Sequence, residues 1–154
     1  MRTVLFALLF AATVIAQTPS VIPPPPDVAA PPKDAKKTPS GLASKVIQPG
    51  TGKDHPASDE LVTVNYTGWV YDPNKPDHKG SQFDTSVGRG PLSFTLGAGE
   101  VIQGWDQGFN DMRVGGKRQL IIPTDMGYGA QGSPDGSIPP NAPIMFEMEL
   151  VDVK

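Results

Sequence analysis

Hydrophobic and polar residues alternate along four segments of this 154-residue chain. In LVTVNYTGWVY, residues 61–71, the side chains of Val62, Val64 and Tyr66 fall on one side of an extended chain, with Thr63 between them on the other. Because successive side chains of a strand point to opposite faces, this alternation predicts a strand with one buried face. The same reasoning predicts further strands at 91–96, 118–123 and 144–153, and a shorter run suggests another at 44–48.

One stretch has helical spacing instead. Val101, Trp105, Phe109 and Met112 recur at intervals of three and four residues, and the pair at 115–116 consists of two glycines, which can end a helix. An antiparallel sheet with one apolar face needs a cover, and one amphipathic helix supplies it. The sequence therefore predicts an α+β fold in which a curved antiparallel β-sheet wraps around a single short α-helix.

Two glycines stand inside this predicted helix, beside its largest side chain. Gly104 and Gly108 are four residues apart and share one side of the helix. Each costs up to about 1 kcal/mol relative to alanine. We expect the close approach of another backbone, or of a ligand, to offset that cost. Trp105 is then either the floor of a cavity or an ordinary core residue, and the pattern alone leaves both open.

The N-terminal sixteen residues, MRTVLFALLFAATVIA, combine one charge, a short apolar run and small residues before position 17. This pattern predicts a signal peptide, residues 1–16, cleaved after Ala16. An uncleaved anchor fits less well, because a bilayer span needs about 20 apolar residues. Removal of 16 residues leaves 138, and the loss of Arg2 changes the net charge from −3 to −4. We expect a secreted or periplasmic protein with no membrane attachment after cleavage.

Proline and glycine divide the remaining chain near residue 40. Eight of the 18 Pro fall within 17–40, whereas all 17 Gly lie at Gly41 or later. Proline fixes φ and offers no backbone donor, so we predict a Pro-rich disordered linker, largely polyproline II, over 17–40. Residues 41–154 are enough for one domain with a single core.

Charge and residue usage exclude several kinds of function. The mild negative charge argues against nucleic acid and anionic membranes as partners. The absence of Cys excludes disulfides, thiolate metal sites, Cys nucleophiles and lipid attachment at Cys. The two histidines, His55 and His78, stand in Pro- and Asp-rich segments without the spacing of metal ligands. We therefore expect no metal and no cofactor.

The candidate chemistry that remains is aromatic. Asp84 directly follows one of several aromatic residues that the fold can bring together, and segment 127–140, rich in Gly and Pro, could border a cavity. Core packing explains each aromatic residue better when it is taken singly. The set comprises Tyr66, Phe83, Phe94, Trp105, Tyr128 and Phe146.

Six motifs together resemble the FKBP-type peptidyl-prolyl cis-trans isomerases, in that family's order and near its spacing. The resemblance runs from about Gly41 to the end of the chain. It implies the same sheet-and-helix fold and an enzyme that accelerates rotation about X-Pro bonds in folding envelope or secreted proteins. The motifs are VNYTG (64–68), FDTS (83–86), GEVIQGW (99–105), YGAQG (128–132), SIPP (137–140) and FEMEL (146–150).

The resemblance also implies the site. Trp105 would form the floor of a pocket, and the backbone N–H of Ile102 and the hydroxyl of Tyr128 would donate hydrogen bonds to ligand carbonyls. Proline-containing polypeptides, and macrolides like tacrolimus or rapamycin, would be the ligands. The implied catalytic residues are Tyr66, Phe83, Asp84, Ile102, Trp105, Tyr128 and Phe146, and the implied substrate-binding residues are Arg89, Leu92, Phe94, Glu100, Val101 and Ile138.

The chain departs from the family pattern at several positions. Leu92 and Met126 stand where the family often has aromatic residues, and Ser133 lies near a position often held by His. The spacing of Asp84 and Arg89 leaves an ion pair between them open. No long helical segment precedes the domain of the kind that dimerises some secreted relatives, so we expect a monomer.

Two other functions are compatible with the same residues. A binding module or holdase could use the apolar cavity without turnover, although retention of all the implied catalytic residues favours the enzyme. A structural role, in which the Pro-rich arm docks a partner, is the third alternative. The arm contains Ile22-Pro23, a substrate-like dipeptide that could visit the domain's own pocket.

Overall fold

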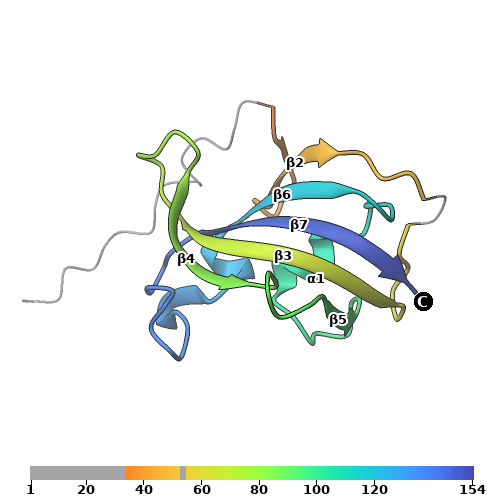
Figure 1. The fold of residues 1–154 in the computed structure, drawn as a ribbon. Helices are drawn as coiled ribbons and strands as arrows, with labels where there is room; N and C mark the ends of the chain where they lie inside the picture. The colour runs from red at the N-terminus through yellow and green to blue at the C-terminus, as the bar shows by residue number, and fades with distance from the viewer. Residues whose placement is uncertain (1–33, 53–54) are drawn as a thin grey trace, which may run out of the picture.

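Seven antiparallel strands form one curved sheet in the computed structural model, which describes residues 34–52 and 55–154 (Figure 1). The strands follow the spatial order β1-β2-β6-β7-β3-β4, and β5 pairs with part of β3. β3 and β7 run side by side through the middle, with Tyr66 opposite Met148. The bounds are β1 (Lys36–Lys37), β2 (Ala43–Gln48), β3 (Leu61–Tyr71), β4 (Lys79–Thr85), β5 (Leu92–Thr95), β6 (Lys117–Ile122) and β7 (Ile144–Val153).

The alternating pattern predicted four of these strands, and the shorter run at 44–48 suggested a fifth, β2. β3 and β7 begin and end at the predicted residues, and β2, β5 and β6 differ from their predicted bounds by one residue at most. β3 and β7 bury alternate side chains against the core, such as Val62 and Val64 or Met148 and Leu150, which is why a hydrophobic period of two marks them, whereas β2 buries only Ala43. The predicted α+β fold with a curved antiparallel sheet is confirmed.

Two strands were not predicted because their sequences do not alternate. β4, with the sequence KGSQFDT, lies at an edge of the sheet and leaves every side chain at least partly exposed. β1 pairs Lys36 with Ser44 of β2, so the end of the predicted linker belongs to the sheet. The predicted signal peptide, and residues 17–33 of the linker, lie outside the described residues.

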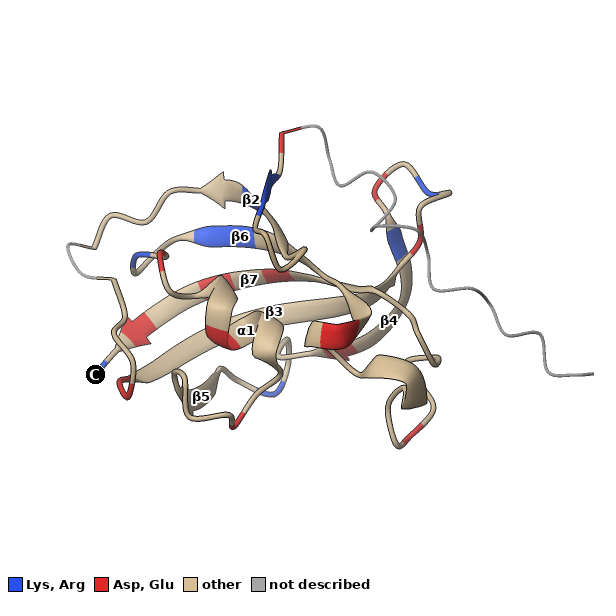
Figure 2. Ribbon diagram, turned by 180° about the vertical axis from the view of Figure 1, so that it is seen from behind, with Lys and Arg blue, Asp and Glu red and all other residues tan. Residues whose placement is uncertain are grey.

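One α-helix, α1 (Gln103–Gly108), lies on one side of the sheet within the described part of the chain (Figures 1 and 2). It is shorter than the hydrophobic pattern predicted. Ile102 is extended, with φ −58° and ψ 149°, and the helix ends before Phe109. Phe109 and Met112 are nevertheless buried in the turns that follow. The spacing therefore predicted the buried side correctly and the length of the helix wrongly.

The two glycines of α1 lie where the helix contacts β6. A Cβ at Gly104 would lie 2.7 Å from Cγ2 of Ile122, and one at Gly108 would lie 2.3 Å from Cδ1 of Leu120. Carbon atoms do not approach so closely without displacement, so glycine permits the helix to sit against the sheet. The nearest atoms belong to side chains, so our expectation that another backbone or a ligand approaches these glycines is wrong.

The main core lies between α1 and the concave face of the sheet. A second, smaller cluster occupies the other face, where Ile121 and Met145 are buried beneath Ala35 and Trp69. The prediction of one dry and one wet face per strand is wrong at this end of the sheet, because the segment before β1 covers it. Fully buried members of the main core include Val62, Val64, Phe109, Leu120, Ile122, Ile144 and Leu150.

The connection from β6 to β7 carries two 3₁₀ helices, η1 (Thr124–Met126) and η2 (Gly129–Gln131). Tyr128 lies between them and reaches the same cavity as Trp105 of α1. No helix within 34–52 and 55–154 is long and apolar enough to cross a membrane.

Candidate active site

Trp105 lies at the centre of an aromatic cluster on the concave side of the sheet. Its ring packs edge-to-face on Tyr66 of β3, with centroids 4.9 Å apart, and on Phe146 of β7, at 5.1 Å. Phe94 of β5 packs on it at 5.7 Å with a tilted geometry. Such aromatic pairs contribute about 0.5–1.5 kcal/mol beyond the area they bury. With 4% of its surface exposed, Trp105 is held firmly by its neighbours.

Phe83 of β4 extends the cluster by packing on Phe146 at 5.4 Å. Gly68 of β3 makes this arrangement possible. A Cβ at Gly68 would lie 2.5 Å from Cε1 of Phe146 and 2.7 Å from Cζ of Phe83. Gly68 is therefore a site residue to which sequence reasoning gave no role, although its place in the VNYTG motif was a signal.

A cavity of about 420 Å³ is bounded by this cluster and by the loops beside α1. Its lining is mostly aromatic and aliphatic with two carboxylates, which suits a small apolar ligand that also carries polar groups. Ten of the thirteen residues implied by the sequence line it: Tyr66, Phe83, Asp84, Leu92, Glu100, Val101, Ile102, Trp105, Tyr128 and Phe146.

The other three implied residues do not line the cavity. Phe94 and Ile138 are buried in the core, with 3% and 2% of their surfaces exposed, and Phe94 supports Trp105 from the side. Arg89 lies beside the cavity, where it contacts Asp84 and Tyr66. These residues can influence a ligand through their neighbours.

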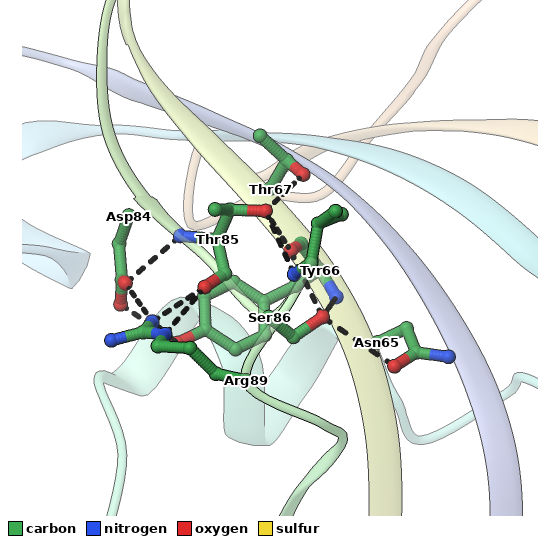
Figure 3. A network of polar contacts seen from close by, with 8 residues as sticks. Asn65, Tyr66, Thr67, Asp84, Thr85, Ser86 and Arg89 are labelled. Carbon is green, nitrogen blue, oxygen red and sulfur yellow. Dashed lines mark hydrogen bonds and ion pairs between the residues drawn. The ribbon is translucent and has the colours of Figure 1, made fainter.

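A polar network connects the start of the β4–β5 loop with β3 (Figure 3). The Tyr66 hydroxyl donates to Oδ2 of Asp84 at 2.7 Å, and Arg89 forms an ion pair with Oδ1 of the same carboxylate. Nε of Arg89 also donates to the Thr85 carbonyl at 2.9 Å. The structure thus contains the Asp84–Arg89 ion pair that the sequence left open. The carboxylate is held in place by donors on both of its oxygens.

Ser86 fixes the loop to the sheet. Its hydroxyl accepts the backbone N–H of Tyr66 at 2.9 Å, and its own N–H donates to the Tyr66 carbonyl at the same distance. Thr85 adds a hydroxyl contact to Thr67 at 2.9 Å. Buried polar groups with satisfied bonds favour one geometry. Both residues belong to the FDTS motif, but the sequence alone did not predict these contacts.

The tyrosine hydroxyls remain protonated in this environment. Burial, followed by the hydrogen bond to Asp84, raises the pKa of Tyr66 to about 12. Burial also raises the pKa of Tyr128, with smaller contributions from the charges of Asp84 and Asp135. Both groups are therefore hydrogen-bond donors, rather than bases, across the physiological range.

Three donors at the cavity have no acceptor among the described residues. Two of them, the backbone N–H of Ile102 and the hydroxyl of Tyr128, belong to residues that line the cavity, whereas the third, Nε1 of Trp105, is buried beneath its surface and out of a ligand's reach. Ile102 is extended immediately before α1, so its N–H is not used by the helix. Buried polar groups nearly always have partners in folded proteins. The N–H of Ile102 and the hydroxyl of Tyr128 are suited to the carbonyl groups of a ligand.

A sequence model of one family matches residues 52–151, and its description is FKBP-type peptidyl-prolyl cis-trans isomerase. This range contains all six motifs and every residue that lines the cavity. The chain belongs to the FKBP-type peptidyl-prolyl cis-trans isomerases. It is therefore a peptidyl-prolyl cis-trans isomerase, as the sequence implied.

Relatives of this FKBP-type isomerase occur in fungi and bacteria. FK506-binding protein 1B of Aspergillus fumigatus is 49% identical over 115 residues, covering 74% of this chain and 95% of the relative. The FK506-binding protein of Neisseria meningitidis serogroup B is 48% identical over 114 residues, covering 73% and 96%. Both alignments leave out about a quarter of this chain.

Solved structures agree with the family assignment. The peptidyl-prolyl cis-trans isomerase of Pseudomonas syringae pv. tomato superposes with a TM-score of 0.66 and 36% identity, covering 83% of this chain and 85% of that one. FkpA from Escherichia coli also gives a TM-score of 0.66, with 40% identity, covering 79% of this chain. The isomerase spans about half, 52%, of the FkpA chain.

Of the three departures from the family pattern, one lies at the border of the cavity. Leu92 lines it, whereas Met126 is buried in the core. Ser133 donates to Oδ1 of Asp135 at 2.6 Å and accepts the N–H of Ile138 at 2.8 Å. Hydroxyl bonds from Ser133 and Ser137 lower the pKa of Asp135 to about 2. This FKBP-type domain therefore has a polar loop that keeps a negative charge beside Tyr128.

Proposed function

We propose that this isomerase acts on X-Pro bonds without covalent chemistry, by holding the twisted amide in the cavity above Trp105. The observation that carries this proposal is the combination of an apolar, aromatic cavity with donors that the described residues leave unused. The proline ring would pack on Trp105. Carbonyl groups of the peptide would accept hydrogen bonds from Ile102 N–H and the Tyr128 hydroxyl.

The physical basis is the change of polarity during rotation. Amide resonance gives rotation a barrier of roughly 18–20 kcal/mol, so the uncatalysed step takes tens to hundreds of seconds. The twisted amide loses the charge-separated resonance form and is less polar than the planar one. Water stabilises the planar dipole, and replacing it with aromatic rings favours the twisted state. Binding energy is then directed to the transition state.

Asp84 serves in this proposal as a positioning group. Its oxygens are occupied by Tyr66 and Arg89, which hold the ring of Tyr66 against Trp105. The raised pKa of Tyr66 means that its proton is not released at neutral pH. We therefore assign neither Asp84 nor Tyr66 a proton-transfer step.

A protease-coupled assay with X-Pro peptides tests the proposal. The protein should accelerate cis-to-trans conversion catalytically, and tacrolimus should compete, because the A. fumigatus and N. meningitidis relatives carry the name FK506-binding protein. Stoichiometric peptide binding without turnover would favour the holdase alternative. Acceleration that survives removal of the indole floor in Trp105→Ala would contradict the site.

We further propose that the enzyme is secreted or periplasmic and acts on envelope or secreted polypeptides. The support is the apolar N-terminal segment and the Pro-rich residues 17–40 in the sequence. Cell fractionation and N-terminal sequencing of the mature protein test this. A mature chain that starts at Gln17 in the culture medium or periplasm is expected, and a full-length cytoplasmic chain would contradict it.

A further inference from the structure

The two carboxylates that line the cavity differ in how their charges are balanced. Asp84 is paired with Arg89, and four other carboxylates of the domain also form ion pairs. Glu100 forms none with the described part of the chain. Of the two cavity carboxylates, Glu100 is therefore the one without an ion-pair partner among the described residues.

Glu100 is also oriented by the protein. Its Oε2 accepts the backbone N–H of Thr95 at 2.9 Å, which ties the carboxylate to the end of β5. Leu92, at the start of β5, lines the cavity beside it, and Ile102, with its unused N–H, follows two residues later. A peptide held by Ile102 would therefore place a residue next to proline near this carboxylate.

The charges around the cavity reinforce the effect of Glu100. Asp135 carries no ion pair within the described ranges, and together with Asp84 it raises the pKa of Tyr128 on the other side of the cavity. In the view facing α1, acidic segments mark the helix and the loops beside it, whereas a broad basic segment lies on β6 (Figure 2). A cation entering between Glu100 and Asp135 is attracted from both sides, whereas the charge of Asp84 is balanced by Arg89.

We propose that Glu100 selects proline-containing segments that carry a lysine or arginine immediately next to the proline. This inference rests on the isomerase activity proposed above and specifies its substrates. Glu100 acts as a specificity-determining residue through the charge of its side chain. A neutral neighbour of proline gains nothing from it, and an acidic neighbour is repelled.

Exchange NMR on matched peptides tests the proposal with the full mature protein. One peptide series varies the residue before proline, and a second varies the residue after it, each with lysine, its uncharged analogue norleucine, or glutamate. We expect kcat/KM to rise about threefold for lysine and fall about threefold for glutamate, relative to norleucine, in at least one series at low salt. At 1 M salt, where the screening length is about 3 Å, the preference should disappear.

Glu100→Gln should bring the lysine-to-glutamate ratio close to one, and this ratio is independent of any change in total activity. Glu149→Gln is the matched control, because it removes the same charge from the opposite face of the sheet, away from the cavity. It should leave the ratio unchanged. Equal acceleration of all six peptides, or a ratio that Glu100→Gln does not alter, would overturn the inference while the activity stands. No acceleration of any peptide would instead overturn the proposed function.

Discussion

Trp105 and Phe109 stand one helical turn apart, yet one borders a cavity and the other lies in a filled core. Phe109 is fully buried, with Phe94 at 5.8 Å and Trp105 itself at 5.9 Å. Trp105 is almost as buried, but the 420 Å³ cavity lies on one side of its ring. The two residues have the same position in the hydrophobic pattern, so the cavity arises from what surrounds each ring.

Different residues pack around the two ends of the helix. Near Phe109, the helix backbone at Gly108 contacts Leu120, and Met112 is buried in the following turn. Near Trp105, the chain before α1 is extended at Ile102, and the rings of Tyr66 and Phe146 meet the indole by their edges. The helix thus contacts β6 at both glycines, but beside Trp105 it also borders a ligand-sized space, and beside Phe109 it does not.

Truncation of each ring should have the largest effects on stability and activity. Phe109→Ala and Trp105→Ala should each lower the free energy of unfolding by about 3–5 kcal/mol, measured by urea denaturation. Only Trp105→Ala should also lower kcat/KM per folded molecule, by about tenfold or 1.4 kcal/mol. Because Phe109→Ala could unfold the domain, Phe109→Leu provides a milder variant. Equal losses of activity per folded molecule at both positions would show that the cavity is not the site.

A second test adds a methyl group beside the cavity, at Gly68 of β3, and another in the filled core, at Gly108 of α1. Gly68→Ala would push Cβ into the rings of Phe83 and Phe146, and Gly108→Ala would push it into Leu120. Overpacking of this kind costs about 1–3 kcal/mol of stability. At Gly108 a gain of up to about 1 kcal/mol in helix propensity opposes that cost. Gly68→Ala should lower kcat/KM and tacrolimus affinity, and Gly108→Ala should change stability alone. Unchanged tacrolimus binding by Gly68→Ala would contradict the assigned role of this glycine.

The same pair of residues shows what the sequence could predict. The spacing of Trp105 and Phe109 identifies both as buried, because burial on one side of a helix repeats along the chain. It cannot distinguish them, because the space beside Trp105 depends on rings from β3, β4 and β7 that are distant in sequence. Motif resemblance, which carries the combined positions of all these residues, did identify most of the lining.

Three other features could not be predicted from the hydrophobic pattern, for related reasons. β4 has few buried side chains, so its pairing with β3 leaves no hydrophobic period to detect. The second cluster around Ile121 depends on coverage by Ala35, which alternation within a strand does not reveal. The lack of an ion-pair partner for Glu100 likewise follows only from the positions of the cations in the described residues.

One aspartate–arginine pair lies beside the cavity and another lies at the filled end of α1. We expect mutations of the first pair to change activity and mutations of the second to change stability. At the cavity, Asp84→Leu removes the acceptor of Tyr66 and the partner of Arg89. We expect kcat/KM to fall about tenfold, the size of one hydrogen bond to a charged group, with a change of less than about 1 kcal/mol in unfolding free energy. Asp84→Asn keeps an acceptor oxygen and should lose less. Full activity in Asp84→Leu would remove Asp84 from the site.

At the filled end, Arg118 is 7% exposed and pairs with Asp111, so this pair should affect stability and not catalysis. The hydrogen bond from Arg118 holds the pKa of Asp111 below its usual value of 3.8. A lowered pKa stabilises the folded state above the unfolded pKa, and that contribution is lost as pH falls through the folded value. Because Asp111 is largely exposed, we expect its charge to contribute less than about 1 kcal/mol to the free energy of unfolding.

Urea unfolding should therefore show a difference between the native protein and Asp111→Asn at pH 6 that shrinks toward pH 3, with kcat/KM unchanged at neutral pH. A difference that is the same at both pH values would mean that Asp111 contributes through packing and not through its charge.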